Sequence, residues 1–235
     1  MTAALSIQKK LQNLKNRDKA QILQKFFKTG PGQYGEGDIF LGITVPILRK
    51  TAKEHLELSF SELQKLLNSK IHEERLLALL ILVLRYPKTD PKEKEETYNF
   101  YLKNLKNINN WDLVDLTAPQ IVGEYLLKRK KEPLYHLAQS EHLWSRRISI
   151  IATFQFIKNH EFNCTLKIAK TLLLDQQDLI QKAVGWMLRE IGKRELQAEE
   201  QFLKKHYLKM PRTMLRYAIE KFEETKRQQY LKSLI

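Results

Sequence analysis

Apolar residues recur at helical spacing along almost the whole chain, and this pattern limits the possible folds more than any other feature. From residue 45 onward, no stretch shows a convincing period-two alternation of the kind found in a half-buried strand. Glycine and proline together supply only 15 of 235 residues, too few for the many turns of an all-β domain. The sequence predicts an all-α fold with helices over 4–14, 18–28, 45–57, 59–68, 71–86, 92–106, 111–128, 132–139, 144–159, 162–174, 177–193, 197–208, 211–222 and 225–234.

Several of these helices open alike, with a polar residue followed by an apolar run. The opening residues recur 37, 35 and 35 residues apart, and a further copy starts about 30 residues later. This period is typical of HEAT-like two-helix repeats, which stack into a solenoid with a concave face. We expect one HEAT-like repeat domain over 1–235 with a concave basic face, and an irregular helical bundle is the alternative. A charged strip across that face would comprise Arg75, Asp112, Arg147, Lys182 and Arg212.

The chain is strongly basic, with 41 Lys+Arg against 27 Asp+Glu and a formal net charge of +14. Such an excess attracts polyanions, of which nucleic acid is the commonest for a soluble protein. The alternative is a solvated, lysine-rich surface that serves solubility. The longest apolar run, Leu76–Leu84, has nine residues, about half the length of a membrane-spanning helix. The first fifteen residues lack the apolar core of a secretory signal, so we expect a cytoplasmic protein without membrane contact.

The segment after Asn110 is the strongest candidate for chemistry. Asn110 suits the N-cap of the next helix, and Trp111 and Asp115 share one helix face because they are four residues apart. Asp112 in the first turn would offset the helix dipole. Asp115 lies deeper among apolar neighbours, where a carboxylate needs a reason. It is either a functional carboxylate or one partner of a structural ion pair.

Other segments carry weaker signals. Trp186 lies between Lys182 and Arg189 on one face of a predicted helix. It is either an aromatic residue that binds a ligand or a residue of the core. Residues 144–147 place a tryptophan before two arginines at a helix start, and residues 30–38 hold four of the eight glycines around Tyr34. That loop is either a connector or a segment able to follow a phosphate backbone. The single cysteine, Cys164, fits a buried thiol, and the six histidines form no metal-binding motif.

Taken together, these segments resemble the AlkD family of bacterial DNA alkylation repair glycosylases. The likeness extends over about residues 20–222 in the family's order and is carried by residues 34–43, 111–115, 144–147, 181–190 and 212–221. It implies a solenoid of HEAT-like repeats that binds DNA and releases positively charged N3- and N7-alkylated purines. The family's essential carboxylate falls on Asp115, the two tryptophans beside the lesion's deoxyribose on Trp111 and Trp186, and a phosphate-binding arginine on Arg147; Tyr34 is a looser match.

The resemblance leads to a specific expectation. The chain should act as a monomer on double-stranded DNA containing alkylated bases, in base excision repair, and be nucleoid-associated when bound to DNA. A cationic base leaves without a general acid, so we expect neither a metal nor another cofactor. Two other functions remain open, a non-catalytic DNA binder of the same fold and a helical-repeat scaffold for protein interactions. Besides Arg147 and Tyr34, the candidate DNA-binding residues are Lys182, Arg189, Arg212 and Arg216.

Overall fold

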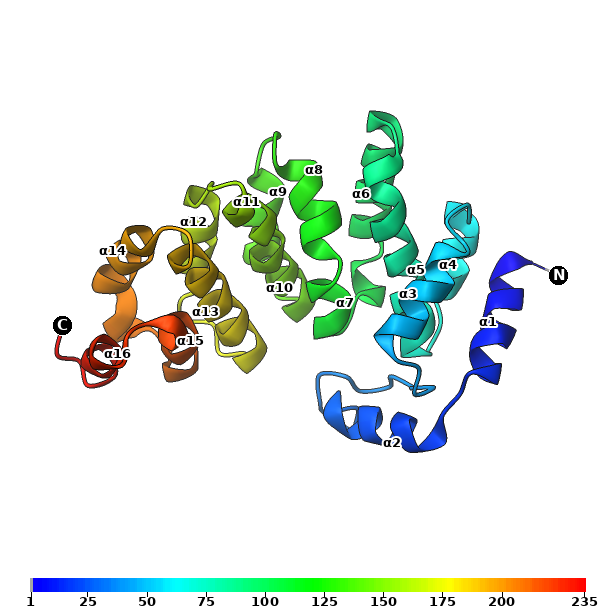
Figure 1. Ribbon diagram of the computed structural model, residues 1–235, viewed down its shortest axis with the longest axis horizontal. Helices are drawn as coiled ribbons and strands as arrows, with labels where there is room; N and C mark the ends of the chain where they lie inside the picture. The colour runs from blue at the N-terminus through cyan, green and yellow to red at the C-terminus, as the bar shows by residue number, and fades with distance from the viewer. Residues whose placement is uncertain (1) are drawn as a thin grey trace. The chain divides into compact units, whose positions relative to one another are not determined.

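The computed structural model describes residues 2–235, and these residues form an all-α structure, as predicted. Within them the sole β feature is an isolated parallel bridge between Ile39 and Ile71. The chain divides into two compact units, unit 1 up to Thr117 and unit 2 from Ala118 onward. Figure 1 shows the helices in chain order, coloured from the N-terminus. This division does not test the expectation of one domain over 1–235, which stays a prediction.

Unit 1 is built around α5, because its apolar run is buried on every side. Leu76 to Leu82 are each no more than 2% exposed, since α3, α4 and α7 all contact this helix. In Figure 1, α2 lies crosswise to α3 and α5. The helices of unit 1 are α1 (Ala3–Asn13), α2 (Arg17–Phe26), α3 (Val45–Lys53), α4 (Phe60–Leu67), α5 (His72–Arg85), α6 (Pro91–Lys103) and α7 (Trp111–Asp115), with 3-10 turns η1 (Tyr86–Lys88) and η2 (Leu105–Asn107).

Unit 2 repeats a two-helix arrangement in which α10 packs on α9 and α13 packs on both α14 and α15. Its core consists of isoleucines, alanines and leucines on α10, α13 and α15. Its elements are η3 (Pro119–Gly123), α8 (Glu124–Leu126), α9 (Glu132–Ala138), α10 (Leu143–Ala152), α11 (Phe154–Lys158), α12 (Asn163–Thr171), α13 (Asp178–Gly192), α14 (Leu196–His206), η4 (Tyr207–Lys209), α15 (Arg212–Ala218), η5 (Ile219–Lys221) and α16 (Glu224–Leu231).

Two predicted helices are broken in the structure. The helix expected over 111–128 ends at Asp115 and resumes at Pro119 as a π-helical turn, η3. Proline has no backbone N–H, so Pro119 cannot donate to the carbonyl of Asp115 four residues earlier, and α7 ends there. The helix expected over 144–159 divides at Thr153, whose hydroxyl donates to the carbonyl of Ile150 at 2.6 Å. These two predictions were wrong in extent.

One buried carboxyl group in unit 2 has no charged partner within ion-pair distance. Glu199 on α14 is 1% exposed, its Oε1 has no hydrogen-bond partner, and its side chain packs against Gly192. Burial and the neighbouring Glu200 raise the pKa of Glu199 to about 9, and Arg189 offsets this only in part. Glu199 therefore carries a proton at neutral pH.

Candidate functional site

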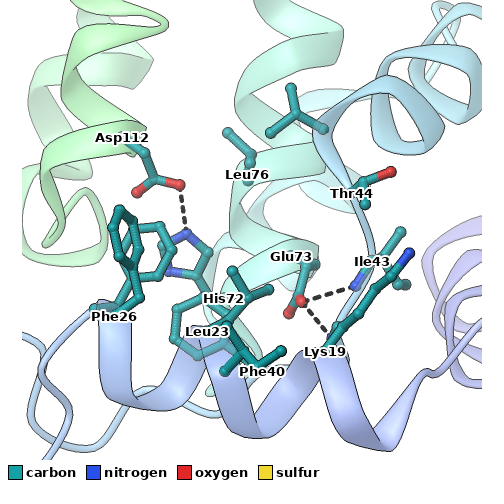
Figure 2. Close-up of a pocket in the computed structure, with 14 residues that line it drawn as sticks. Lys19, Leu23, Phe26, Phe40, Ile43, Thr44, His72, Glu73, Leu76 and Asp112 are labelled. Atoms are coloured by element: carbon teal, nitrogen blue, oxygen red, sulfur yellow. Dashed lines mark hydrogen bonds and ion pairs between the residues drawn. The ribbon is translucent and has the colours of Figure 1, made fainter.

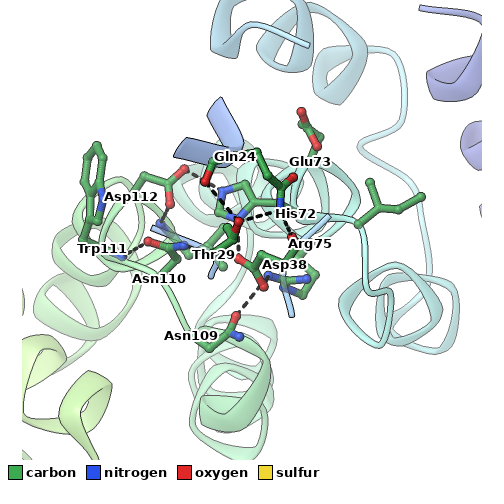
Figure 3. A network of polar contacts seen from close by, with 12 residues as sticks. Gln24, Thr29, Asp38, His72, Glu73, Arg75, Asn109, Asn110, Trp111 and Asp112 are labelled. Atoms are coloured by element: carbon green, nitrogen blue, oxygen red, sulfur yellow. Dashed lines mark hydrogen bonds and ion pairs between the residues drawn. The ribbon is translucent and has the colours of Figure 1, made fainter. Parts of the chain in front are cut away.

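His72 lies between two carboxylates in the interior of unit 1. Its Nδ1 is 3.0 Å from Oδ2 of Asp38, and its Nε2 is 2.8 Å from Oδ2 of Asp112, as Figure 3 shows. All three side chains are at least nine-tenths buried. An ionised carboxylate only accepts hydrogen bonds, so both ring nitrogens must carry a proton to satisfy it. The geometry therefore requires His72 to be an imidazolium.

A second cation completes the cluster. Arg75, 3% exposed, places Nη2 2.6 Å from Oδ1 of Asp38 and 3.1 Å from Oδ1 of Asn109, and its Nη1 donates to the carbonyl of Ser69 at 2.9 Å. Asn110 donates to Oδ2 of Asp38 at 3.2 Å. Two carboxylates thus face two cations, so the cluster is electrically neutral only when His72 is protonated.

The pKa values agree with this balance. Burial by itself would lower the pKa of His72, but the charge of Asp112 and the hydrogen bonds to Asp112 and Asp38 outweigh it and raise the pKa to about 9. Burial would likewise raise the pKa of Asp38, yet His72 and Arg75 hold it below its usual range. His72 is therefore protonated and Asp38 ionised at neutral pH.

An aromatic stack connects His72 to Trp111. The imidazole ring lies 4.5 Å from the ring of Phe40, and the ring of Phe40 lies 4.9 Å from that of Phe27. Phe27 in turn stacks on the indole of Trp111, with centroids 5.1 Å apart and planes 12° apart. Phe26 meets the same indole edge-on at 5.9 Å. Phe27 therefore covers one face of the indole.

The start of α7 is fixed by its own polar side chains. Asn110 Oδ1 accepts from the backbone N–H of Trp111 at 2.9 Å, which confirms the predicted N-cap, and Asp112 Oδ1 accepts from the backbone N–H of Leu113 at 2.9 Å. Trp111 and Asp115 are both half-buried and lie one turn apart on this helix. Burial, together with the Asp115 carboxylate, raises the pKa of fully buried Tyr101, and the hydrogen bond between the hydroxyl groups of Tyr101 and Thr117 offsets this in part.

An apolar cavity of about 330 Å³ adjoins the cluster, between α2, the segment before α3 and α5 (Figure 2). His72 and Asp112 form part of its wall, and Phe26 of α2 is 60% exposed. Glu73 lines it too, with a carboxylate that accepts from three successive backbone N–H groups at 2.8 to 3.2 Å, those of Leu41, Gly42 and Ile43. Glu73 therefore fixes the segment that leads into α3.

The glycine-rich loop reaches the same part of unit 1. A Cβ atom on Gly35 would lie 2.4 Å from the carbonyl oxygen of Phe27 and 3.5 Å from the amide nitrogen of Asn110, so only glycine fits at this approach. Tyr34, next to it, is half-buried. Asp38 ends the loop inside the charged cluster. The loop is thereby attached to the start of α7.

The remaining candidates belong to unit 2. Trp186 on α13 is half-buried, and its Nε1 donates to Oε1 of Glu190 at 3.3 Å. Arg147 on α10 is 5% exposed and donates to the carbonyl of Leu179. Lys182 pairs with Asp178 at 2.6 Å.

Three arginines complete the set of unit 2. Arg189, on the same helix as Trp186, pairs with Glu220 of η5. Arg212 and Arg216 on α15 are exposed, and Arg212 donates to the carbonyl of Leu231 at 3.0 Å. Arg212 and Arg216 are thus the most accessible cations of the predicted DNA-binding set.

The chain matches a known family over almost its entire length. A model of the DNA alkylation repair enzyme family covers residues 7–222. The chain belongs to that family. No curated protein matches the chain.

Solved structures resemble this DNA alkylation repair protein in fold. A protein described as a predicted DNA alkylation repair enzyme from Enterococcus faecalis has 18% identity and a TM-score of 0.68, over 89% of this chain and 97% of the other. AlkD2 from Streptococcus mutans has 17% identity and a TM-score of 0.57, over 88% and 98%. The protein smu.31 from Streptococcus mutans has 17% identity and a TM-score of 0.56, over 76% and 92%. These likenesses show the helical-repeat fold.

For this family member, the expected charged strip needs a correction. Arg75 and Asp112 are 3% and 6% exposed and pair with Asp38 and His72, so they belong to the interior cluster and not to an exposed face. The period that suggested the strip is nevertheless present, since Arg75, Asp112, Arg147, Lys182 and Arg212 all lie within the first five residues of α5, α7, α10, α13 and α15.

The sequence analysis missed His72, Asp38 and Glu73, and it placed Arg75 on an exposed face. One signal was available: residues 72–75 are four consecutive ionisable residues directly before the longest apolar run of the chain. A helix that is apolar all round is buried all round, so its first turn enters the interior as well. Buried charges must be paired, and the pairing partners come from distant segments.

Two further observations concern residues 2–235. No group of three or more histidine, cysteine, aspartate or glutamate side chains there is arranged to hold a metal ion. No helix there is long and apolar enough to cross a membrane. Cys164 is buried, as predicted, and burial raises the pKa of its thiol.

Proposed function

We propose that this protein hydrolyses the N-glycosidic bond of positively charged N3- and N7-alkylated purines in duplex DNA. The observation that carries the proposal is the pairing of Trp111 and Asp115 one turn apart on α7, in a chain of the DNA alkylation repair family. The first turn of α7 lies in the buried cluster of paired charges, and Phe27 stacks on one face of the Trp111 indole. A carboxylate and an aromatic face fixed in this way suit a cationic sugar.

The chemistry needs one carboxylate. When the C1′–N bond breaks, its electron pair neutralises the cationic base, which leaves without an added proton. The sugar then has oxocarbenium character, and the Asp115 carboxylate stabilises this charge and orients a water molecule. The water oxygen bonds to C1′ and its proton passes to Asp115 or to solvent. Contact with the indole of Trp111 stabilises the sugar cation by about 0.5–2 kcal/mol.

DNA binding is assigned to cations of unit 2. Arg212 and Arg216 are exposed and can take phosphates directly, while Lys182 and Arg189 would exchange Asp178 and Glu220 for phosphate. We assign Arg147 to a phosphate and Trp186 to the sugar of the lesion, and Tyr34 to the DNA backbone beside it. Duplex DNA carrying alkylated bases is the proposed partner.

The deciding experiment measures free N7-methylguanine released from methylated duplex DNA in the presence of a chelator. Asp115→Asn should abolish release and leave duplex affinity within about twofold, because the amide keeps the shape and loses the charge. Glu95→Gln, an exposed change on α6, is the matched control and should keep full activity. Duplex binding without release by the wild type would indicate a non-catalytic DNA binder. Weak duplex binding even at low salt would favour a protein scaffold.

A further inference from the structure

The charged cluster of unit 1 has a role that its burial alone does not explain. Three segments far apart in the sequence meet at His72: the end of the glycine-rich loop through Asp38, the first turn of α5, and the first turn of α7 through Asp112 (Figure 3). A single ring nitrogen faces each carboxylate. One protonated side chain thus connects the loop and α7 with two charged hydrogen bonds.

The same ring supports Trp111 by a second route. The imidazole lies 4.5 Å from the ring of Phe40 and 5.1 Å from that of Phe27, and Phe27 carries the indole at 5.1 Å. A protonated imidazole attracts the faces of neighbouring aromatic rings. His72 therefore contacts this part of α7 in two ways. Its Nε2 binds the carboxylate of Asp112, the residue next to Trp111. Its ring lies at the end of the aromatic stack that packs against the indole.

We propose that His72 is a positioning residue, an imidazolium that fixes the first turn of α7 and thereby the orientation of Trp111 and Asp115. This inference rests on the proposed function, since it concerns the same site. His72 acts through Asp112 and Phe27 and needs no contact with DNA. Its effect should therefore appear in the rate of the chemical step and not in affinity for the duplex.

The proton on His72 should decide this effect. The charged groups that face it are Asp38 from the loop, Arg75 from its own helix and Asp112 from α7, while Glu73 of α5 and Lys19 of α2 line the adjoining cavity. When the imidazolium loses its proton, one carboxylate loses its donor and the cluster acquires an unpaired buried negative charge. The start of α7 and the stack under Trp111 should then rearrange together.

The first measurement uses fluorescence and is independent of activity. In the full chain with Trp144→Phe and Trp186→Phe, Trp111 is the sole remaining tryptophan. Its emission should show a transition with a midpoint near pH 9, the value to which Asp112 and Asp38 raise the pKa of His72. Adding His72→Gln should remove that transition and leave only the quenching by ionised tyrosines at higher pH. A transition that persists unchanged in His72→Gln would overturn the proposal.

The second measurement uses base release. His72→Gln should lower kcat by about 10- to 100-fold with KM within threefold, because a small displacement of positioned groups costs rate more than binding. The control is Leu63→Ala, which truncates a buried side chain of α4 outside the cluster. When assayed well below its own melting temperature, this variant should have the kcat of the wild type. Wild-type kcat in folded His72→Gln would contradict the proposal.

If His72→Gln does not fold, Asp112→Asn provides the test. This variant keeps His72 and Asp38 and removes the charge of Asp112, which raises the pKa of His72 more than its hydrogen bond to Asp38 does. In the single-tryptophan chain, the fluorescence midpoint should move down by at least one pH unit, and an unmoved midpoint would refute the role of His72. Absence of base release in the wild type would reject the proposed function alone, because the fluorescence results stand without it.

Discussion

The indole of Trp111 lies parallel to the phenyl ring of Phe27, with centroids 5.1 Å apart and an angle of 12° between the planes. This contact joins Phe27, the residue that follows the last residue of α2, to the first residue of α7. The candidate site therefore depends on a residue of the chain's first thirty, a segment that carries no catalytic candidate of its own.

Phe27→Leu should remove the platform under Trp111 and weaken unit 1. Stacked pairs contribute about 0.5–1.5 kcal/mol beyond their buried area, and a smaller side chain adds a partial cavity, so we expect a loss of about 2 kcal/mol in the free energy of unfolding. Urea denaturation measures the loss, and base release should fall together with it. The control Phe60→Leu removes a ring on α4 that packs against Phe100 of α6. It should lower the free energy of unfolding but leave kcat unchanged.

Glu73→Gln should destabilise the segment before α3. The Oε1 atom of Glu73 accepts from the backbone N–H groups of Leu41, Gly42 and Ile43, and its Oε2 accepts from that of Leu41 as well. An amide keeps one oxygen, but its NH₂ group takes the place of the other and faces the N–H donor of Leu41. Placing two buried donors against each other and weakening the remaining hydrogen bonds costs about 1–3 kcal/mol. Equilibrium denaturation of Glu73→Gln against Glu95→Gln tests this, and equal stability of the two variants would refute the role of Glu73.

Stability should fall as the pH rises from about 6.5 to about 9. The folded protein raises the pKa of His72 to about 9, so between these values the folded state holds a proton that the unfolded state has released. The contribution of His72 is fully present below pH 6.5 and is lost as the pH rises through 9, in total about 3 kcal/mol. Melting temperatures measured at intervals from pH 6 to 9 should show the decline.

The matched variant for that experiment is His72→Gln, whose stability should fall less steeply over the same interval, because Glu199 still holds a proton that the unfolded chain has released. Asp38 affects the stability of the fold at acidic pH. Its lowered pKa means that its contribution is present above pH 4 and is lost as the pH falls through its folded value. A wild-type profile that falls no more steeply from pH 6.5 to 9 than that of His72→Gln would show that His72 is neutral in the folded state.

Gly185→Ala should disturb the packing of α13 on α15. An added methyl would lie 2.4 Å from the carbonyl oxygen of Met214 and 2.5 Å from Cβ of Tyr217, so the two helices must separate. Overpacking costs about 1–3 kcal/mol or more against a gain in helix propensity of about 1 kcal/mol, and we expect a net loss of about 2 kcal/mol. Calorimetry should show the lower melting temperature, with the exposed change Gln201→Ala as a neutral reference.

Arg216→Ala should weaken duplex binding equally for all sequences. Removing one cation that neutralises a phosphate reduces the slope of log affinity against log salt by about 0.9. Fluorescence anisotropy over a range of salt concentrations measures both effects. Lys92→Ala on α6 removes an exposed charge of the same sign from unit 1 and should leave the slope unchanged. Equal slopes for wild type and Arg216→Ala would exclude this residue from the interface.

The helices were predictable because each buries an apolar face whose spacing is visible in the sequence. The ends of the helices were less predictable. The helix breaks after Asp115 because of Pro119, but the apolar pattern continues past this proline and predicts one uninterrupted helix. Trp111 and Asp115 could be singled out because both stand on one helix. The cluster of Asp38, His72 and Asp112 could not, since its members are 34 and 40 residues apart and meet only through tertiary packing.

His72 keeps a proton that an ordinary histidine would have released at neutral pH, and Glu199 keeps one that an ordinary glutamate would have released. Each retained proton adds one positive charge to the folded chain relative to the formal count. The two residues together therefore bring the net charge at pH 7 to two above the formal +14. Unfolding discards both protons. The native form is therefore the one that a polyanion attracts most strongly, and it should migrate faster toward a cathode than its amino-acid content predicts.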